Sequence, residues 1–184
     1  MRRIAGFGQP LLYLDFDGVL HHEHVVRAPG RGIYIAAPAR YSLFQHVGLL
    51  EVLLDPYPDV RIVLSTTWVR VLTFSMALKR LPALLQARVI GATWHSSMHE
   101  GAFVHLPRGQ QILDDVQRRQ PMDWLAFDDD AVGWPTEHRE RLVHTDPHEG
   151  ISAPEVLEEC RVKLRKLVGV LPVTGRNCKV GDRP

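Results

Sequence analysis

Short apolar segments alternate with longer amphipathic ones along most of the chain. Runs of apolar, β-branched and aromatic residues predict strands, and they cover residues 11–16, 60–64, 87–90, 124–127 and 141–144. Apolar residues at helical spacing predict helices over residues 41–54, 68–81, 109–119 and 154–168. Strands that are apolar throughout are typical of parallel sheets covered on both faces. We therefore predict an α/β fold with a central, mostly parallel sheet of about five strands.

The segments between these elements bear on domain organisation. Residues 21–40 are rich in His, Arg, Pro and Gly and predict a long loop or small flap. Residues 91–107 are expected to be irregular, and residues 171–184 to form a loosely ordered tail. The remainder, residues 1–170, is predicted to be a single domain.

Composition and charge narrow the class of protein. Lys plus Arg number 22 and Asp plus Glu 21, which gives a net charge of +1. A charge this small produces no global field that attracts nucleic acid, although a local basic patch is still possible. The two cysteines, Cys160 and Cys178, form neither a zinc pattern nor a disulfide framework, which favours a reducing cytoplasm. The chain has no apolar run that is long enough to span a membrane, so we expect no membrane partner.

Three of the predicted strands end in side chains suited to phosphate chemistry. The first ends at Asp15 and Asp17, and Gly18 lets the chain turn sharply after them. The second strand leads into hydroxyl groups and the fourth into paired acids, namely Ser65, Thr66, Thr67, Asp128 and Asp129. Ligands of open α/β sheets bind at the carboxyl ends of the strands. Carboxylates gathered there need a hard cation such as Mg²⁺, which also bridges to phosphate.

With these residues in this order, the chain resembles the haloacid-dehalogenase-like (HAD) phosphohydrolase superfamily. Its first motif is DxDx[TV], and residues 15–19 read DFDGV. Its second and fourth motifs are apolar strands that end in Ser or Thr and in paired acids, matched by VRIVLS and LAFDD. Its third is a Lys or Arg ahead of a helix, for which Arg108 is the candidate and Lys79 and Arg80 are rivals. More narrowly, LYLDFDGVL, LSTTW, RGQQI and WLAFDDD are similar to the small HAD domains associated with RNA-repair proteins.

The resemblance implies a three-layer, Rossmann-like HAD core and a Mg²⁺-dependent phosphatase that forms an aspartyl-phosphate intermediate. Asp15 is implied to be the nucleophile, and Asp17 to protonate the leaving oxygen and then activate water. Ser65 and Arg108 are implied to bind the transferred phosphoryl group. The implied Mg²⁺ ligands are Asp15, the backbone carbonyl of Asp17, and Asp129, with Asp128 either sharing the metal or supporting the site.

Segment lengths indicate how the site meets its substrate. Residues 21–40 suffice only for a flap, and residues 82–107 must already supply a core strand, so we predict no folded cap domain. An uncapped site admits a bulky phosphate carrier, such as a nucleic-acid end, or gains closure from a partner protein or an oligomer. A nucleotide or small metabolite is the rival class of substrate.

Several residues are candidates for contacts around this site. Thr66 and the histidines His21 and His22 are candidate substrate contacts, with Arg27 and Arg31 of the flap beside them; a solvated flap is the other interpretation of the histidines. Asp146 follows the fifth strand and is a candidate supporting residue. The competing function is a HAD-like binding or assembly module with little turnover. The intact set of acids argues against it, since a scaffold has no need of clustered carboxylates.

Overall fold

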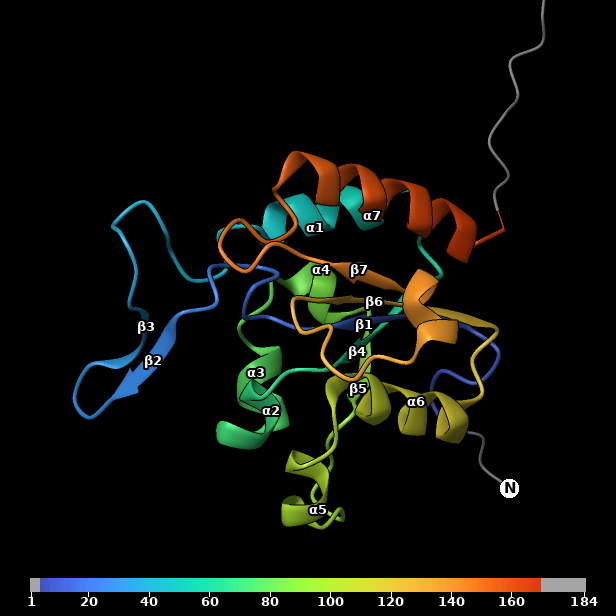
Figure 1. Ribbon diagram of the computed structural model, residues 1–184, viewed down its shortest axis with the longest axis horizontal. Helices are drawn as coiled ribbons and strands as arrows, with labels where there is room; N and C mark the ends of the chain where they lie inside the picture. The colour runs from blue at the N-terminus through green and yellow to red at the C-terminus, as the bar shows by residue number, and fades with distance from the viewer. Residues whose placement is uncertain (1–3, 170–184) are drawn as a thin grey trace, which may run out of the picture.

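The structure is a computed structural model, which describes residues 4–169 (Figure 1). Five strands form one parallel sheet in the order β5-β4-β1-β6-β7. Their bounds are β1 Pro10–Leu14, β4 Arg61–Leu64, β5 Val89–Ala92, β6 Asp123–Asp128 and β7 Leu142–His144. The predicted α/β fold is therefore confirmed, with a sheet that is wholly rather than mostly parallel.

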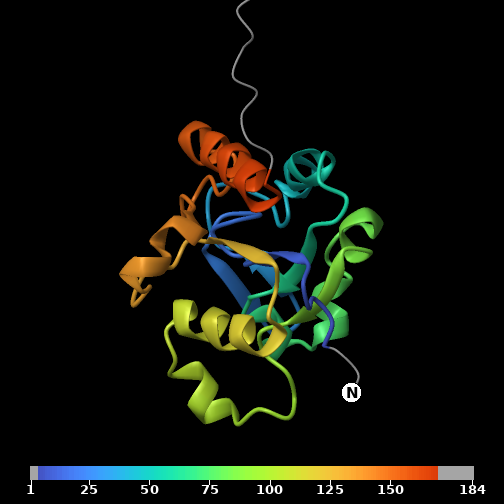
Figure 2. The ribbon, with the colours of Figure 1, turned by 90° about the vertical axis from the view of Figure 1, so that its right-hand side faces the viewer.

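Helices cover both faces of this sheet and make a three-layer core (Figure 2). Helices α1 (Val47–Leu54) and α7 (Pro154–Leu167) pack on one face, and α6 (Arg108–Arg119) packs on the other. Successive side chains of a strand point to opposite faces, so Leu12 and Leu14 join the first core while Leu11 and Tyr13 join the second. Burial on both faces explains why the strand is apolar throughout.

Two helices differ from the predictions, each at one residue that interrupts the helical pattern. The helix predicted from residue 41 begins only at Val47, because Phe44 takes a left-handed conformation (φ 59°) and turns its ring onto that of Phe16. The helix predicted over 68–81 is broken at Thr73, whose hydroxyl accepts the Met76 amide at 3.2 Å and so caps a new helix. The two pieces are α2 (Trp68–Val71) and α3 (Phe74–Leu78).

Short elements occupy three connections in which no element was predicted. They are α4 (Ala83–Gln86), α5 (Glu100–Val104) and the 3₁₀ helix η1 (Thr136–Arg141). Helix α5 corrects the expectation that residues 91–107 are irregular. It has five residues, and the His99 ring caps its N-terminus by accepting the Ala102 amide at 3.2 Å.

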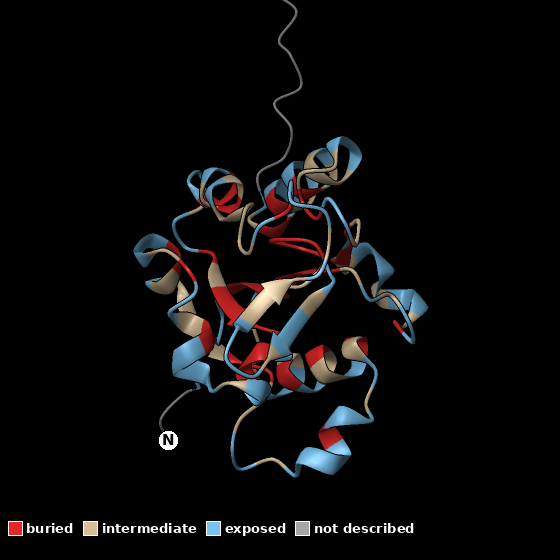
Figure 3. Ribbon diagram, turned by 90° about the vertical axis from the view of Figure 1, so that its left-hand side faces the viewer, coloured by how far each residue is buried: buried red, intermediate tan, exposed pale blue. Residues whose placement is uncertain are grey.

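The flap after β1 is a β-hairpin that projects from the core (Figures 1 and 3). Its strands are β2 (Val25–Ala28) and β3 (Gly32–Ile35), paired antiparallel across a turn with Gly30 at φ 75°. None of the residues in these two strands is buried. The hairpin is therefore a flap without a core of its own, and the predicted lack of a folded cap is confirmed for residues 4–169.

No helix in this described range is both long and apolar enough to cross a membrane. The predicted tail, residues 171–184, lies outside the described residues. The prediction of a single domain over residues 1–170 stays a prediction.

Candidate functional site

The carboxyl end of β1 meets the ends of its two neighbours. Asp15 follows β1, and its amide donates to the carbonyl of Phe127 in β6 at 3.1 Å. On the other side, the amide of Ser65 donates to the carbonyl of Leu14 at 2.8 Å. Because β1 is central and parallel to both neighbours, the three polar strand ends lie at one edge of the sheet.

Three carboxylates gather at this edge. Asp15, Asp128 and Asp129 each offer an oxygen, and these oxygens lie within 4.8 Å of one another. Asp15 and Asp128 are buried, with 4% and 0% of their surface exposed. One oxygen of Asp128, Oδ2, is buried and has no hydrogen-bond partner within the described part of the chain. An all-oxygen, anionic donor set with an unsatisfied buried atom fits a hard divalent cation such as Mg²⁺.

The turn after Asp15 leaves space for the side chain of Asp129 in this group. Gly18 has φ 64°, and a Cβ at that position would overlap the carboxylate of Asp129. The hydroxyl of Thr145, behind the turn, donates to the carbonyl of Gly18 at 2.7 Å and holds it. Glycine is thus needed for both its backbone conformation and its missing side chain.

Arg108, at the start of α6, reaches two of the three acids. Its Nη2 lies 3.0 Å from Asp15 Oδ2, and its Nε lies 3.2 Å from Asp128 Oδ2. The first contact has hydrogen-bond geometry and the second does not. Of the rival cations, Arg80 places its guanidinium over the Trp68 ring, 5.7 Å from the ring centroid, and Lys79 is exposed.

One guanidinium does not offset three carboxylates. Burial raises the pKa of Asp15 and raises that of Asp128 well above its usual range, while Arg108 lowers both and the neighbouring acids raise them further. Burial, followed by the charge of Asp15, raises the pKa of Asp129 to about 7. Full ionisation of the three acids would therefore leave excess negative charge in the buried site, which bound protons or a bound cation would relieve.

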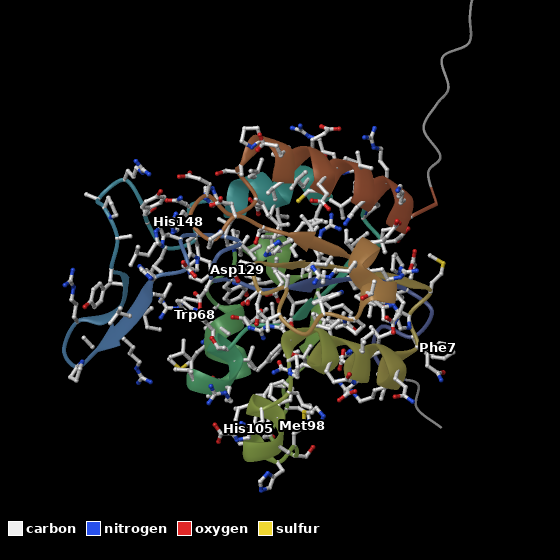
Figure 4. The ribbon with its side chains drawn as sticks, viewed as in Figure 1. Phe7, Trp68, Met98, His105, Asp129 and His148 are labelled. Atoms are coloured by element: carbon white, nitrogen blue, oxygen red, sulfur yellow. The ribbon has the colours of Figure 1, made fainter. Side chains whose placement is uncertain are left out.

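Asp17 is held apart from this group of oxygens. Its Oδ1 accepts the indole N–H of Trp68 at 2.8 Å and lies 3.0 Å from Nε2 of His21. The Asp17 side chain is 28% exposed, so it lies at the rim of the site. Trp68 and Asp129 lie at the edge of the sheet that faces the hairpin (Figure 4).

The two histidines after the first motif are buried, which corrects the interpretation of them as part of a solvated flap. His21 is 0% exposed and packs against the rings of Phe44 and Trp68, with centroids 4.8 and 5.9 Å away. His22 is 5% exposed and stacks on His148. Neither ring therefore belongs to a solvated flap, whereas the role of His21 and His22 as substrate contacts stays a prediction. His21 instead contacts Asp17, because the turn at Gly18 folds the chain back on itself.

The hydroxyl groups after β4 differ in their partners. Ser65 Oγ is buried and has no hydrogen-bond partner among residues 4–169. Thr66 is also buried; its Oγ1 accepts the Trp68 amide at 3.4 Å, and its hydrogen bond to Asp15 lowers the pKa of that acid. Asp146, expected as a supporting residue, accepts the amides of His148 and Glu149 in its own loop, each at 2.8 Å.

Sequence reasoning did not find Trp68 as a partner of Asp17. The signal was present, since Trp68 follows the second motif directly in LSTTW, but an indole at that position reads equally well as core.

One family model matches the chain, and it covers residues 11–156. The model is described as the HAD domain in Swiss Army Knife RNA repair proteins. No match was found among curated proteins or among solved structures.

Proposed function

Since the chain belongs to the family of HAD domains in Swiss Army Knife RNA repair proteins, we propose that it is a Mg²⁺-dependent phosphomonoesterase. The observation that carries this proposal is the meeting of Asp15, Asp128 and Asp129 with Arg108 at one sheet edge. Asp15, Asp128 and Asp129 would hold Mg²⁺, together with the carbonyl of Asp17. The bound cation would neutralise phosphoryl and carboxylate charge.

The residues of the site divide the reaction between them. A carboxylate oxygen of Asp15 attacks phosphorus, the ester P–O bond breaks, and the leaving oxygen takes a proton from Asp17. Arg108 and the free hydroxyl of Ser65 bind the phosphoryl oxygens. The Asp17 carboxylate then takes a proton from water, whose oxygen attacks the aspartyl-phosphate. Phosphate leaves, and Asp15 is restored. Positioning and charge neutralisation are the main demands of phosphoryl transfer.

The substrate class that we propose is a phosphorylated polynucleotide end. The description of the family favours it, and the lack of a folded cap within residues 4–169 is compatible with a large phosphate carrier. A partner protein or a second copy would supply any further closure. The buried, free thiol of Cys160 agrees with a reducing cytoplasm as the proposed location.

Phosphate release tests the proposal. The full chain should release phosphate from an aryl phosphate with Mg²⁺ and lose this activity in excess EDTA. Asp15→Asn and Asp17→Asn should lower kcat by about a hundredfold or more, in the range of lost nucleophilic and acid–base catalysis. Asp59→Asn is the matched control, because Asp59 is an exposed acid outside the site. Full activity in Asp15→Asn would rule out the mechanism. No release from any phosphate ester would favour a binding or assembly module.

A further inference from the structure

A groove of about 130 Å³ opens beside Asp17, between the flap hairpin and α2. Val25 and Ile33 line it from the hairpin, and Val71 and Leu72 line it from α2 and the residue after it. Its walls are therefore mainly aliphatic, although Asp17 lies at its opening. A groove of this kind suits an apolar, planar group better than a small polar one.

The position of Asp17 indicates which part of a substrate enters this groove. On the proposed function, Asp17 donates a proton to the leaving oxygen and must lie within hydrogen-bond reach of it. The leaving group therefore departs on the Asp17 side of the phosphoryl group. Asp17 and its hydrogen-bond partner Trp68 both line the groove, so it continues from the point where the leaving oxygen is released.

Charge adds a second requirement. Arg27 also lines the groove and is exposed. Arg31, on the same hairpin, does not line it and lies over the ring of Tyr34, 3.7 Å from the centroid. Of the two flap arginines expected to meet substrate, Arg27 is thus placed to bind an anion beyond the leaving oxygen, and Arg31 is engaged elsewhere.

We propose that the groove holds the terminal nucleoside of a phosphorylated polynucleotide end. The base packs between the aliphatic walls, and Arg27 binds the phosphodiester that follows. This inference rests on the proposed function and names its leaving-group site. A phosphate ester such as glycerol phosphate has neither a planar base for the walls nor a second phosphate for Arg27.

The test compares an oligoribonucleotide phosphate, in its 3′- or 5′-phosphorylated form, with glycerol phosphate. Arg27→Gln should lower the ratio of their kcat/KM values by about tenfold or more, as expected for a lost charge-assisted hydrogen bond. Arg31→Gln is the matched control and should leave the ratio unchanged. Val71→Trp should lower the ratio by filling the groove; Val71 is 45% exposed, so the fold tolerates the change. Val52→Trp, at a 70% exposed position on α1, controls for it.

Binding gives a second readout that needs no turnover. Fluorescence anisotropy with the labelled phosphorylated oligonucleotide and the Asp15→Asn protein should show weaker binding when Arg27→Gln or Val71→Trp is added. Equal effects of Arg27→Gln and Arg31→Gln, or an unchanged ratio and unchanged binding, would overturn the groove assignment. A failure of the proposed function looks different, because phosphate release is then absent while the groove variants still weaken binding.

Discussion

The indole N–H of Trp68 donates to Oδ1 of Asp17 at 2.8 Å, across 51 positions of sequence. This bond, with the contact from the buried His21, holds the proposed proton shuttle, Asp17, at the rim of the site. Both contacts are made to Oδ1 of Asp17, and neither involves its Oδ2. The orientation of Asp17 thus depends on α2 and on the turn after β1 together.

Trp68→Phe tests this orientation. The phenyl ring keeps much of the packing against Phe16 and Phe44 but removes the donor. We expect kcat to fall by about tenfold with a smaller change in KM, since the lost bond positions an acid while the phenyl ring keeps an aromatic wall in the groove. Trp124→Phe is the control, because Trp124 lies near the opposite end of the sheet strands. Equal losses in both variants would mean that only packing is affected.

Ser65→Ala separates function from stability. Its buried Oγ has no partner, so removing it should leave the free energy of unfolding unchanged or raise it slightly. Loss of a phosphoryl contact should nevertheless lower kcat/KM by about tenfold. Urea denaturation and phosphate release measure the two effects. A clear loss of stability with unchanged kcat/KM would contradict the assigned role.

Arg108→Lys tests whether one cation must meet two acids. Arg108 contacts Asp15 through Nη2 and Asp128 through Nε, which the single nitrogen of Lys cannot reproduce. Partial activity is expected in Arg108→Lys, and near-complete loss in Arg108→Gln. Arg108→Gln should also destabilise the metal-free protein by about 3 kcal/mol, because buried carboxylates lose their partner. Arg161→Gln, at an exposed ion pair, should cost under about 1 kcal/mol.

Gly18→Ala should disturb the metal group through Asp129. The new Cβ would overlap the Asp129 carboxylate, and φ is 64°. We expect weaker Mg²⁺ binding by calorimetry, together with a loss of about 1–2 kcal/mol in stability from the left-handed backbone. Gly8→Ala is a matched control, since Gly8 has φ 65° but nothing within 4 Å of its Cβ position. It should share the backbone cost and keep the Mg²⁺ affinity.

The metal-free protein should lose stability as pH rises. Burial and Asp15 raise the pKa of folded Asp129 to about 7, above the usual value of 3.8. The stabilisation from its protonated form is therefore complete below about pH 4 and is lost as pH rises through about 7. Asp129→Asn should flatten this part of the Tm profile. Mg²⁺ should raise Tm more at pH 8 than at pH 5, because protons compete with it. An equal gain at both pH values would contradict the cluster as the metal site.

The amino-acid sequence by itself determined the order of the strands along the chain and the acids at their ends. Those signals are local: apolar strands, a glycine after paired acids and hydroxyl groups after a strand each depend on neighbouring residues. The sequence did not predict the helix breaks at Phe44 and Thr73. The periodicity of apolar residues does not reveal a ring that turns inward or a hydroxyl that caps a new helix.

Only the tertiary structure decided which residues meet. Arg108 and Asp15 are 93 positions apart, and their contact depends on α6 beginning beside the end of β1 rather than on any spacing. The same holds for His21, which the turn at Gly18 buries against Asp17, and for the difference between Arg27 and Arg31 on one hairpin. Strand order and side-chain packing determine which of these side chains come into contact. A local pattern of residues predicts neither of them.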